Sequence, residues 1–169
     1  MPEIDDEALV SALLAVSRTM VALTARNLAE LEVDVTLPQY RALVILAGEP
    51  HRSTDLAAEL GVAASTLTRM CDRLCQKGLV HRFQRDGNRR TIWLGLTPSG
   101  RDTVGAVMEA RRAELHRIVQ EAGLTASGRT LRLLHRFVLA GGELLDDDWW
   151  QCWQRSADEA PSKPRRRAG

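Results

Sequence analysis

The chain has 169 residues and a formal net charge of +1, and 44% of its residues are hydrophobic while 27% are charged. This length allows one domain, or one domain with a small appended one, and the composition is that of a globular protein in water. The acidic start MPEIDDEALV differs from a secretory signal, and no uninterrupted apolar run approaches the ~18 residues that cross a bilayer. We therefore expect a cytoplasmic protein with no membrane partner.

The charges are unevenly distributed along the chain. Residues 51–101 hold nine basic and four acidic side chains, whereas residues 1–50 hold three basic and eight acidic ones. A basic segment inside a nearly neutral protein indicates a localised surface that binds a polyanion. The alternative interpretation is a charge-rich face that contacts only solvent and binds no polyanion.

The first predicted element is a long amphipathic helix over residues 5–31, where apolar residues recur at steps of three and four. A connector follows, and Pro38 suits the first turn of a short, largely buried second helix that stops at Gly48. Either Ser53 or Thr54 can then cap a third helix, STDLAAEL.

Gly61 separates the third helix from a fourth one over residues 64–77, whose two faces differ in chemistry. A short helix, a glycine turn and a second helix with a polar outer face form the helix-turn-helix pattern, although many helical pairs turn at glycine. The face expected to be buried contains Leu67, Met70, Cys71 and Leu74. The outer face contains Ser65, Thr66, Thr68, Arg69, Asp72, Arg73 and Gln76.

A basic hairpin follows this helix pair. Residues 79–83 and 91–96 have strand-like sequences, and the pair Asp86-Gly87 between them favours a tight turn. A hairpin attached to a helix-turn-helix is a wing, and basic side chains at its tip can enter a narrow minor groove. The tip contains Arg85, Arg89 and Arg90.

Two further helices are predicted after the hairpin, one from Thr97 to Gly123 and one that Thr125 can cap and that reaches Leu144. The first and last helices expose more apolar surface than a small winged domain can bury, so we expect a partner subunit to cover it. Residues 146–155 place three tryptophans on one helical face, which packs on the same domain or on the partner, or else binds an aromatic ligand. Residues 156–169 are rich in proline and charge, and we expect a disordered basic tail that adds non-specific DNA affinity.

Three segments in this order resemble the MarR family of winged helix-turn-helix transcriptional regulators: LPQYRALVILAGEP, LAAELGVAASTLTRMCDRLCQKGLVHR and RDGNRRTIWLGLTPSGR. The resemblance covers roughly residues 8–145, and its most specific parts are the L-x-x-x-G-L-V junction and the basic wing that leads into L-T-P-x-G. It implies a mainly α fold with a small β-hairpin wing. It also implies an N-terminal dimerisation helix (5–34), a winged helix-turn-helix DNA-binding domain (35–97) and C-terminal dimerisation helices (98–155).

The resemblance also implies a set of DNA-binding residues. The helix at 64–77 would lie in the major groove, with Ser65, Thr66, Thr68 and Arg69 facing base edges and Arg73 on a phosphate. Arg89 or Arg90 would make the wing contact, and Ser53 and Arg85 complete the candidate set. An arginine can make a bidentate contact to guanine, and hydroxyls serve bases or phosphates. Each hydroxyl, taken singly, can equally be a plain solvent-facing group.

The sequence departs from the family pattern at three places. The helix at 64–77, which we call the reading helix, begins with Ala63-Ala64 where the family has a capping residue. The cap is therefore expected to shift to Ser65. Asn88 stands at the wing tip where the family often has aspartate. Family members that sense peroxides carry a cysteine in the first helix, and this chain has none before Cys71.

The leading hypothesis is a homodimeric repressor that binds a pseudo-palindromic operator and is released by a small, aromatic or phenolic, molecule. A ligand that favours one separation of the two DNA-reading domains shifts the population away from the spacing that fits DNA. The candidate ligand-binding residues, each of which can also be ordinary core, are Ser17, Met20, Tyr40, Leu43 and Met108.

An alternative is a thiol- or metal-responsive regulator that senses through Cys71 and Cys75, which lie four residues apart on the reading helix. An enzyme is not expected, because the chain has no phosphate-binding glycine loop, nucleophile elbow or paired-histidine spacing. No cofactor or resident metal is expected.

Overall fold

The computed structural model describes residues 6–84 and 91–158. In the described ranges the chain forms seven helices and three short strands, which confirms the expected mainly helical fold with a small sheet. The elements are α1 (Asp6–Ala29), α2 (Leu37–Gly48), β1 (His51–Arg52), α3 (Ser53–Leu60), α4 (Ala64–Gln76), β2 (Val80–Phe83), β3 (Trp93–Leu96), α5 (Pro98–Glu121), α6 (Gly128–Ala140) and α7 (Asp146–Asp158).

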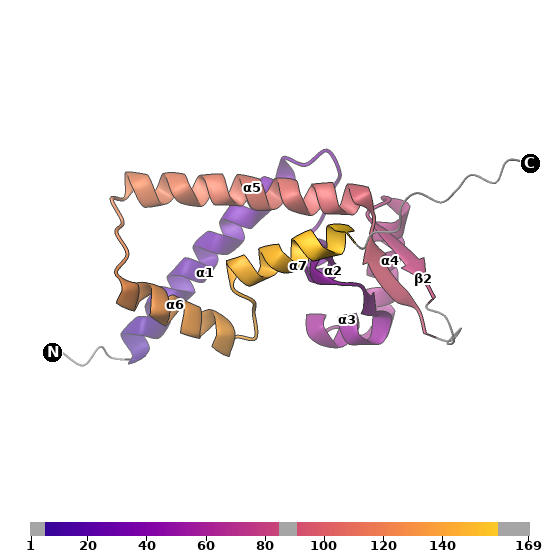
Figure 1. The fold of residues 1–169 in the computed structure, drawn as a ribbon, viewed down its shortest axis with the longest axis horizontal. Helices are drawn as coiled ribbons and strands as arrows, with labels where there is room; N and C mark the ends of the chain where they lie inside the picture. The colour runs from indigo at the N-terminus through magenta and orange to yellow at the C-terminus, as the bar shows by residue number, and fades with distance from the viewer. Residues whose placement is uncertain (1–5, 85–90, 159–169) are drawn as a thin grey trace, which may run out of the picture.

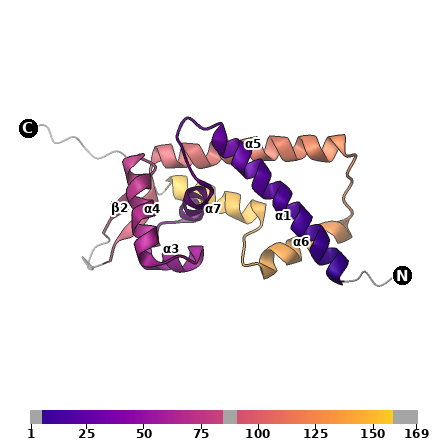
Figure 2. The ribbon, with the colours of Figure 1, turned by 180° about the vertical axis from the view of Figure 1, so that it is seen from behind.

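The molecule has two parts. We call α2, α3, α4 and the three strands the winged head, and α1, α6 and the C-terminal half of α5 the helical arm. Figure 1 shows α5 running the whole length of the molecule, from the head to the far end of the arm, where α6 lies. Figure 2 shows α1 crossing the back of the molecule diagonally, from the end where α6 lies up to α5. Helix α7 turns back from the arm and packs against α2 in the head.

The sheet of the winged head is antiparallel with strand order β1-β3-β2. Strand β2 pairs with β3 from Val80 opposite Leu96 to Phe83 opposite Trp93. Strand β1 adds to the other edge of β3 and was not predicted, because its two residues become a strand only by pairing with residues more than forty positions later. The core beneath the sheet is built from fully buried leucines: Leu43, Leu56, Leu67, Leu74, Leu79 and Leu94.

Local signals explain where helices α2 and α5 begin. Thr36 caps α2 with a capping box, in which the Thr36 hydroxyl accepts from the Gln39 backbone N–H and the Gln39 side chain accepts from the Thr36 N–H. Thr97 caps α5 by accepting through its hydroxyl from the N–H of Gly100. Gly100 is required there, because a Cβ at this position would lie 2.0 Å from the carbonyl oxygen of Leu79.

Three of the predicted caps are wrong. Helix α3 begins at Ser53 after Arg52, whose side chain has no acceptor and provides no cap, and the Ser53 N–H pairs with the carbonyl of Ile92. Helix α4 begins at Ala64 after Ala63, also without a side-chain cap, so the cap does not shift to Ser65. Helix α6 is capped by Ser127 and not by Thr125.

Two helices follow α5, and the first of them is shorter than predicted. Helix α6 ends at Ala140, and Gly142 adopts a positive φ of 78° that a residue with a side chain rarely takes. Helix α7 then begins at Asp146 and continues to Asp158, which is three residues into the segment predicted to be disordered. The rest of that predicted tail, residues 159–169, lies outside the described residues.

Helix α1 has a high mean hydropathy, although polar residues interrupt its apolar ones. It contains an 18-residue window with a mean hydropathy of 1.7, so by length and composition alone it could cross a membrane. Its C-terminal end is anchored in the protein through the buried residues Leu23, Thr24, Asn27 and Leu28. Its N-terminal half exposes apolar side chains along the arm, among them Val10, Leu14 and Val16.

Candidate nucleic-acid interface

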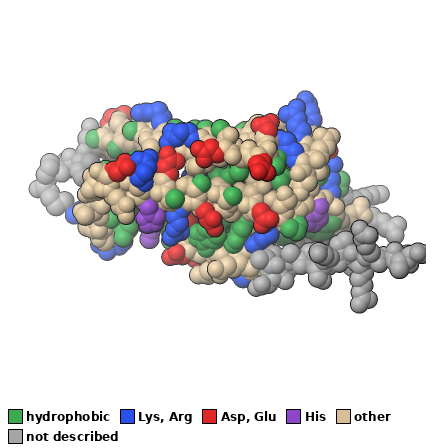
Figure 3. Space-filling view, turned by 90° about the horizontal axis from the view of Figure 1, so that it is seen from above, with side chains coloured by type: hydrophobic (Ala, Val, Ile, Leu, Met, Phe, Trp, Pro, Cys, Tyr) green, Lys and Arg blue, Asp and Glu red, His purple; other side chains and the backbone are tan. Residues whose placement is uncertain are grey.

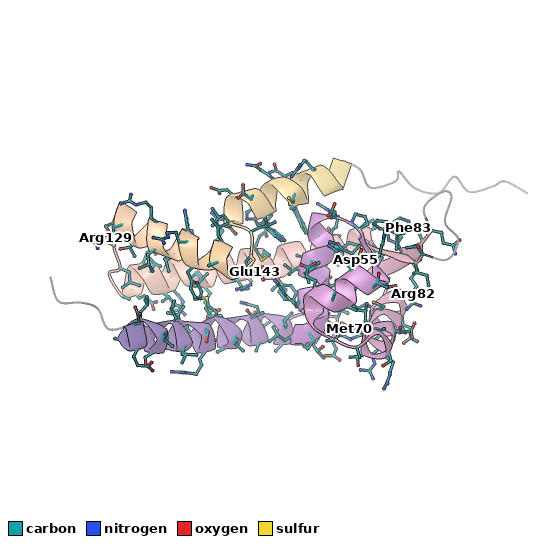
Figure 4. All side chains as sticks on the ribbon, turned by 90° about the horizontal axis from the view of Figure 1, so that it is seen from below. Asp55, Met70, Arg82, Phe83, Arg129 and Glu143 are labelled. Atoms are coloured by element: carbon teal, nitrogen blue, oxygen red, sulfur yellow. The ribbon has the colours of Figure 1, made fainter. Side chains whose placement is uncertain are left out.

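The outer face of α4 is a continuous polar surface. Leu67, Cys71 and Leu74 anchor the helix in the core with 2% exposure or less. The predicted DNA-binding residues of this helix, Ser65, Thr66, Thr68, Arg69 and Arg73, are all exposed on the opposite side. The structure thus brings these five predicted residues together on one face of α4, the helix that carries the Met70 labelled in Figure 4.

The N-terminus of α4 leaves backbone donors without a side-chain cap. Ala63 occupies the cap position with extended backbone angles and cannot accept a hydrogen bond through its side chain. The first N–H groups of a helix carry partial positive charge and bind anions such as phosphate. The missing cap therefore suits a helix end that approaches the phosphate backbone of a duplex.

The hydroxyl groups on and near this face are not equivalent. Thr68 donates its hydroxyl proton to the carbonyl of Ala64 at 2.9 Å, so it can only accept hydrogen bonds from a base or a water molecule. Ser65 and Thr66 make no side-chain hydrogen bond with any residue of the described ranges. Ser53 is half-buried beside Thr68 in a 160 Å³ cavity between α3, α4 and the sheet, and so is less accessible than the others.

Arg69 and Arg73 supply positive charge that the described part of the protein does not neutralise. Neither of them forms an ion pair with a residue in the described ranges. Both line a 220 Å³ groove between α4 and the N-terminus of α2, to which Thr36 and Gln39 also contribute. The groove combines two free guanidinium groups with the positive end of a helix dipole, a combination that favours a bound anion.

Arg82 is a residue of the interface that was not predicted. Its guanidinium forms an ion pair with the Asp72 carboxylate of α4 at 2.8 Å and lies 3.5 Å from the carbonyl oxygen of Thr68. These contacts join strand β2, the base of the wing, to the middle of α4, and Figure 4 shows Arg82 and Phe83 at the head end of the molecule. The sequence does contain a signal for this ion pair, because Asp72 lies on the expected outer face of the helix and Arg82 lies in the next predicted strand.

The stem of the wing is stiffened by aromatic contacts. His81 stacks on Phe83 with ring centroids 5.3 Å apart, and Phe83 lies 6.4 Å from Trp93 across the strand pair. From strand β1, which pairs with the other edge of β3, the guanidinium of Arg52 lies 5.4 Å from the centre of the Trp93 ring. The tip itself, with Asp86-Gly87, Asn88 and the predicted residues Arg85, Arg89 and Arg90, lies outside the described residues.

The five predicted ligand-binding residues occupy different environments. Ser17 is exposed on α1 and donates its hydroxyl proton to the carbonyl of Leu14, while Met20 is half-buried. Leu43 and Tyr40 are core residues of α2, with 0% and 3% exposure. Met108 lines a 360 Å³ cavity between α5 and α7.

The Tyr40 hydroxyl is buried next to the Arg111 guanidinium. Burial raises the pKa of this hydroxyl, and the Arg111 guanidinium nearby opposes the increase.

The cysteines of α4 lie on the side of the helix that faces the core. Cys71 is buried, and burial raises the pKa of its thiol to about 11, so the thiol is protonated at neutral pH. Cys75 is half-buried. No group of three or more His, Cys, Asp or Glu side chains with the geometry of a metal site is found in the part of the chain that the structure describes.

The comparisons with known proteins agree with this geometry. The sequence model of the MarR family matches residues 35–92. The chain is 26% identical over 106 residues to YfiV of Bacillus subtilis, an HTH-type transcriptional regulator, and the match spans 60% of this chain and 66% of that protein. It is 28% identical over 82 residues to the transcriptional repressor MprA of Escherichia coli, which spans 47% of each chain. The chain thus covers less than two thirds of the length of these relatives.

A solved structure gives a longer match. The crystal structure of RV1404 from Mycobacterium tuberculosis is similar with a TM-score of 0.74 and 38% sequence identity, and the match covers 85% of this chain and 99% of that one. The likeness therefore extends beyond the winged head into the helices of the arm. Together with the exposed reading helix, these matches show that the chain is a transcriptional regulator of the MarR family.

Proposed function

We propose that the protein is a repressor that binds a pseudo-palindromic operator as a homodimer and is released from it by a small molecule. The observation that carries the DNA-binding part is the outer face of α4, where Arg69 and Arg73 are exposed without an acidic partner in the described ranges. An arginine in the major groove can contact guanine with two hydrogen bonds, which discriminates against other bases by ~1–3 kcal/mol. Repression is supported by the role that the name of MprA states for that relative.

The position and charge of each residue on α4 decide which part of the DNA we assign to it. Ser65, Thr66, Thr68 and Arg69 lie on the exposed face, and we assign them to base edges and adjacent phosphates. Arg73 is assigned to a phosphate, because it lines the groove at the positive N-terminus of α2. Arg85, Arg89 and Arg90 are assigned to the wing contact on the strength of sequence alone, and Ser53 is assigned to the edge of the surface.

The homodimer is supported by the surface of the arm. Helix α6 has no buried residue, and its apolar side chains are about half exposed, from Leu134 at 43% to Leu139 at 56%. Apolar side chains also appear between the charged ones along the face of the molecule that Figure 3 shows. An apolar surface of this extent normally marks an interface, and a two-fold dimer buries the same patch on both copies. We assign residues 5–34 and 98–155 to dimerisation and residues 35–97 to DNA binding.

Two-fold symmetry gives the small molecule a means to act. A dimer presents two copies of α4, and only one separation of them, about 34 Å, fits successive major grooves of a duplex. A ligand that binds another separation more tightly shifts the population away from DNA. A cytoplasmic location follows from this role, since the DNA and the ligand must both be accessible.

The test begins with DNA that co-purifies with the full-length protein from cells. These fragments are sequenced, and an enriched duplex is used with a random duplex of equal length in binding titrations. Arg69→Ala should weaken binding to the enriched duplex by roughly tenfold or more, and weaken binding to the random duplex less. Arg18→Ala on α1, an exposed arginine of the arm, is the matched control and should change neither. An equal loss on both duplexes would limit Arg69 to a phosphate contact, and no loss on either would remove α4 from the interface.

A further inference from the structure

Helix α7 is joined to α5 at two separate points. Near the C-terminal end of α7, the Arg101 guanidinium lies 4.2 Å from the centre of the Trp153 ring and donates to the Trp153 carbonyl at 2.5 Å. At its N-terminal end, Asp146 forms an ion pair with Arg112 at 3.0 Å. Arg101 and Arg112 are about three helical turns apart on α5, so α7 runs antiparallel alongside that helix and cannot turn about a single contact.

The same helix is also joined to α2 in the winged head. Glu143, in the linker that precedes α7, pairs with Arg41 of α2, with 3.2 Å between Oε2 and Nη1. Trp149 and Trp153 stack on each other with ring centroids 5.4 Å apart, and both pack against the hydrophobic core of the head. Helix α7 therefore contacts the head through α2 and the linker, as well as the long helix α5.

Helices α2 and α5 contact each other directly as well. The Tyr40 hydroxyl of α2 lies next to the Arg111 guanidinium of α5, and Val104 and Val107 of α5 are buried in the core of the head. Two helices that meet at one crossing can pivot about it. Here a third helix, α7, contacts both of them at other points, so rotation of the head relative to α5 must break contacts of α7.

The angle between the head and α5 determines where the head lies relative to the arm. Figure 1 shows α5 extending from the head to the far end of the arm, and Figure 4 shows Glu143 between Asp55 in the head and Arg129 at that far end. In a dimer joined through the arms, this angle sets the separation of the two copies of α4. A base-pair step is only ~3.4 Å, so a shift of a few ångströms changes the number of base pairs between half-sites.

We propose that α7 is a brace that fixes the angle between the head and α5, and that it thereby specifies the half-site spacing that the dimer accepts. None of its contacts lies on the outer face of α4, so the brace acts on spacing and not on base preference. The fixed angle is a property of one copy, whereas its effect on spacing rests on the proposed function. The positioning residues are Arg41, Arg101, Glu143 and Trp153.

The first test measures the angle in the full-length protein without DNA. Spin labels that do not require a thiol are placed at Asp55 on α3 and at Glu121 at the end of α5, both of which are exposed. The labelled protein is diluted into unlabelled protein, so that pulsed electron paramagnetic resonance reports the distance within one copy. The wild type should give one narrow distribution, which Arg101→Gln and Trp153→Leu should broaden or shift. Distributions that match the wild type would overturn the proposal.

Milder variants guard against a change in folding. The Arg41 and Glu143 side chains are 43% and 51% exposed, so Arg41→Gln and Glu143→Gln remove the ion pair of the linker and should keep the fold. Both should broaden the distribution in the same direction as the variants of α5 and α7. Arg26→Gln is the matched control, because it removes an ion pair of 2.7 Å with Glu114 that joins α1 to α5 and does not involve α7. Equal broadening in the control would attribute the effect to general loosening and overturn the brace.

The second test measures spacing on DNA. The half-sites of the enriched duplex are kept, and the spacer between them is lengthened or shortened by one base pair at a time. The wild type should prefer one spacer, and the variants of the brace should reduce its advantage over the adjacent spacers severalfold. Base preference within each half-site should stay the same.

Two outcomes of this second test separate the brace from simpler accounts. A variant that loses affinity equally for every spacer would make α7 only a stabilising helix and would overturn the proposal. A wild type without a preferred spacer would overturn the proposed dimeric operator and the effect on spacing with it. The distance measurement distinguishes these cases, because it tests the brace in the absence of DNA.

Discussion

Arg82 on strand β2 and Asp72 on helix α4 form an ion pair with 2.8 Å between Nη2 and Oδ1. The two side chains are 38% and 47% exposed, so the pair stabilises the fold by well under ~1 kcal/mol. Its effect is on orientation, because it links the base of the wing to the helix whose outer face also carries Arg69 and Arg73. Under the proposed function, the pair therefore fixes how the wing and α4 are presented to DNA together.

The first prediction concerns this link. Asp72→Asn removes the ion pair but leaves every donor that could reach DNA, so the wing should lose its fixed position relative to α4. We expect binding to the cognate duplex to weaken severalfold while binding to random DNA stays equal or strengthens, and the thermal midpoint to change little. Fluorescence anisotropy on both duplexes measures this. Glu109→Gln, which removes an exposed acid from α5, is the control; a change of the same size in that variant would attribute the effect to net charge.

The second prediction concerns the junction between the wing and α5. In Gly100→Ala the new Cβ would lie 2.0 Å from the Leu79 carbonyl oxygen, and both groups belong to the backbone. Relief requires a shift of α5 against the sheet, so we expect a loss of ~1–3 kcal/mol in the free energy of unfolding. Gly105→Ala is the control on the same helix, because its Cβ would lie 3.5 Å from Trp153 in ordinary contact. That variant should be neutral or more stable by up to ~1 kcal/mol, measured by urea denaturation. Similar midpoints for the two variants would refute the close approach.

The third prediction concerns pH. The pKa of the Cys71 thiol is raised from 9.0 to about 11 in the folded protein, chiefly by burial. Between these values the unfolded chain loses the proton and the folded protein keeps it, so the free energy of unfolding falls as pH rises. The loss is on the order of 2 kcal/mol by pH 11. Cys71→Val should lack this part of the slope while keeping the part due to Tyr40, whose pKa is also raised. Parallel stability curves for the two proteins between pH 9 and 11 would contradict the assignment.

The fourth prediction addresses regulation through thiols. Cys71 is 2% exposed and protonated at neutral pH, so oxidants should react with it only when α4 opens. We expect the double variant Cys71→Ala/Cys75→Ala to keep the DNA affinity of the wild type, with or without peroxide. Electrophoretic mobility shifts on the cognate duplex measure this directly. Peroxide that releases the wild type but not the double variant would establish the thiol-responsive regulator instead.

Local sequence patterns predicted the elements of the interface well. The alternation of apolar and polar residues over 64–77 placed the reading helix to within one residue at its C-terminal end, and Gly61 marked the turn before it. The L-T-P-x-G segment predicted the start of α5, although only the structure shows that Gly100 is needed for the approach of Leu79.

Features that depend on distant residues were missed. Strand β1 exists because His51 and Arg52 pair with Leu94 and Trp93, and no local pattern in two residues reveals that. The caps of α3 and α4 were mispredicted because the sheet and the core decide where these helices begin. The contacts between α5 and α7, such as those of Arg101 with Trp153 and of Arg112 with Asp146, depend on how α7 folds back, which helical periodicity does not encode.

The central claim is that two copies of α4 read DNA, and selection from a random duplex library with the full-length protein tests it most directly. The account predicts enrichment of a motif with two-fold related half-sites, centred about one helical turn apart, or ~34 Å. A parallel selection with Arg69→Ala should lose the preference at the same position of both half-sites while other positions remain. No enrichment over the starting library, or a single asymmetric site that Arg69→Ala leaves unchanged, would contradict the account.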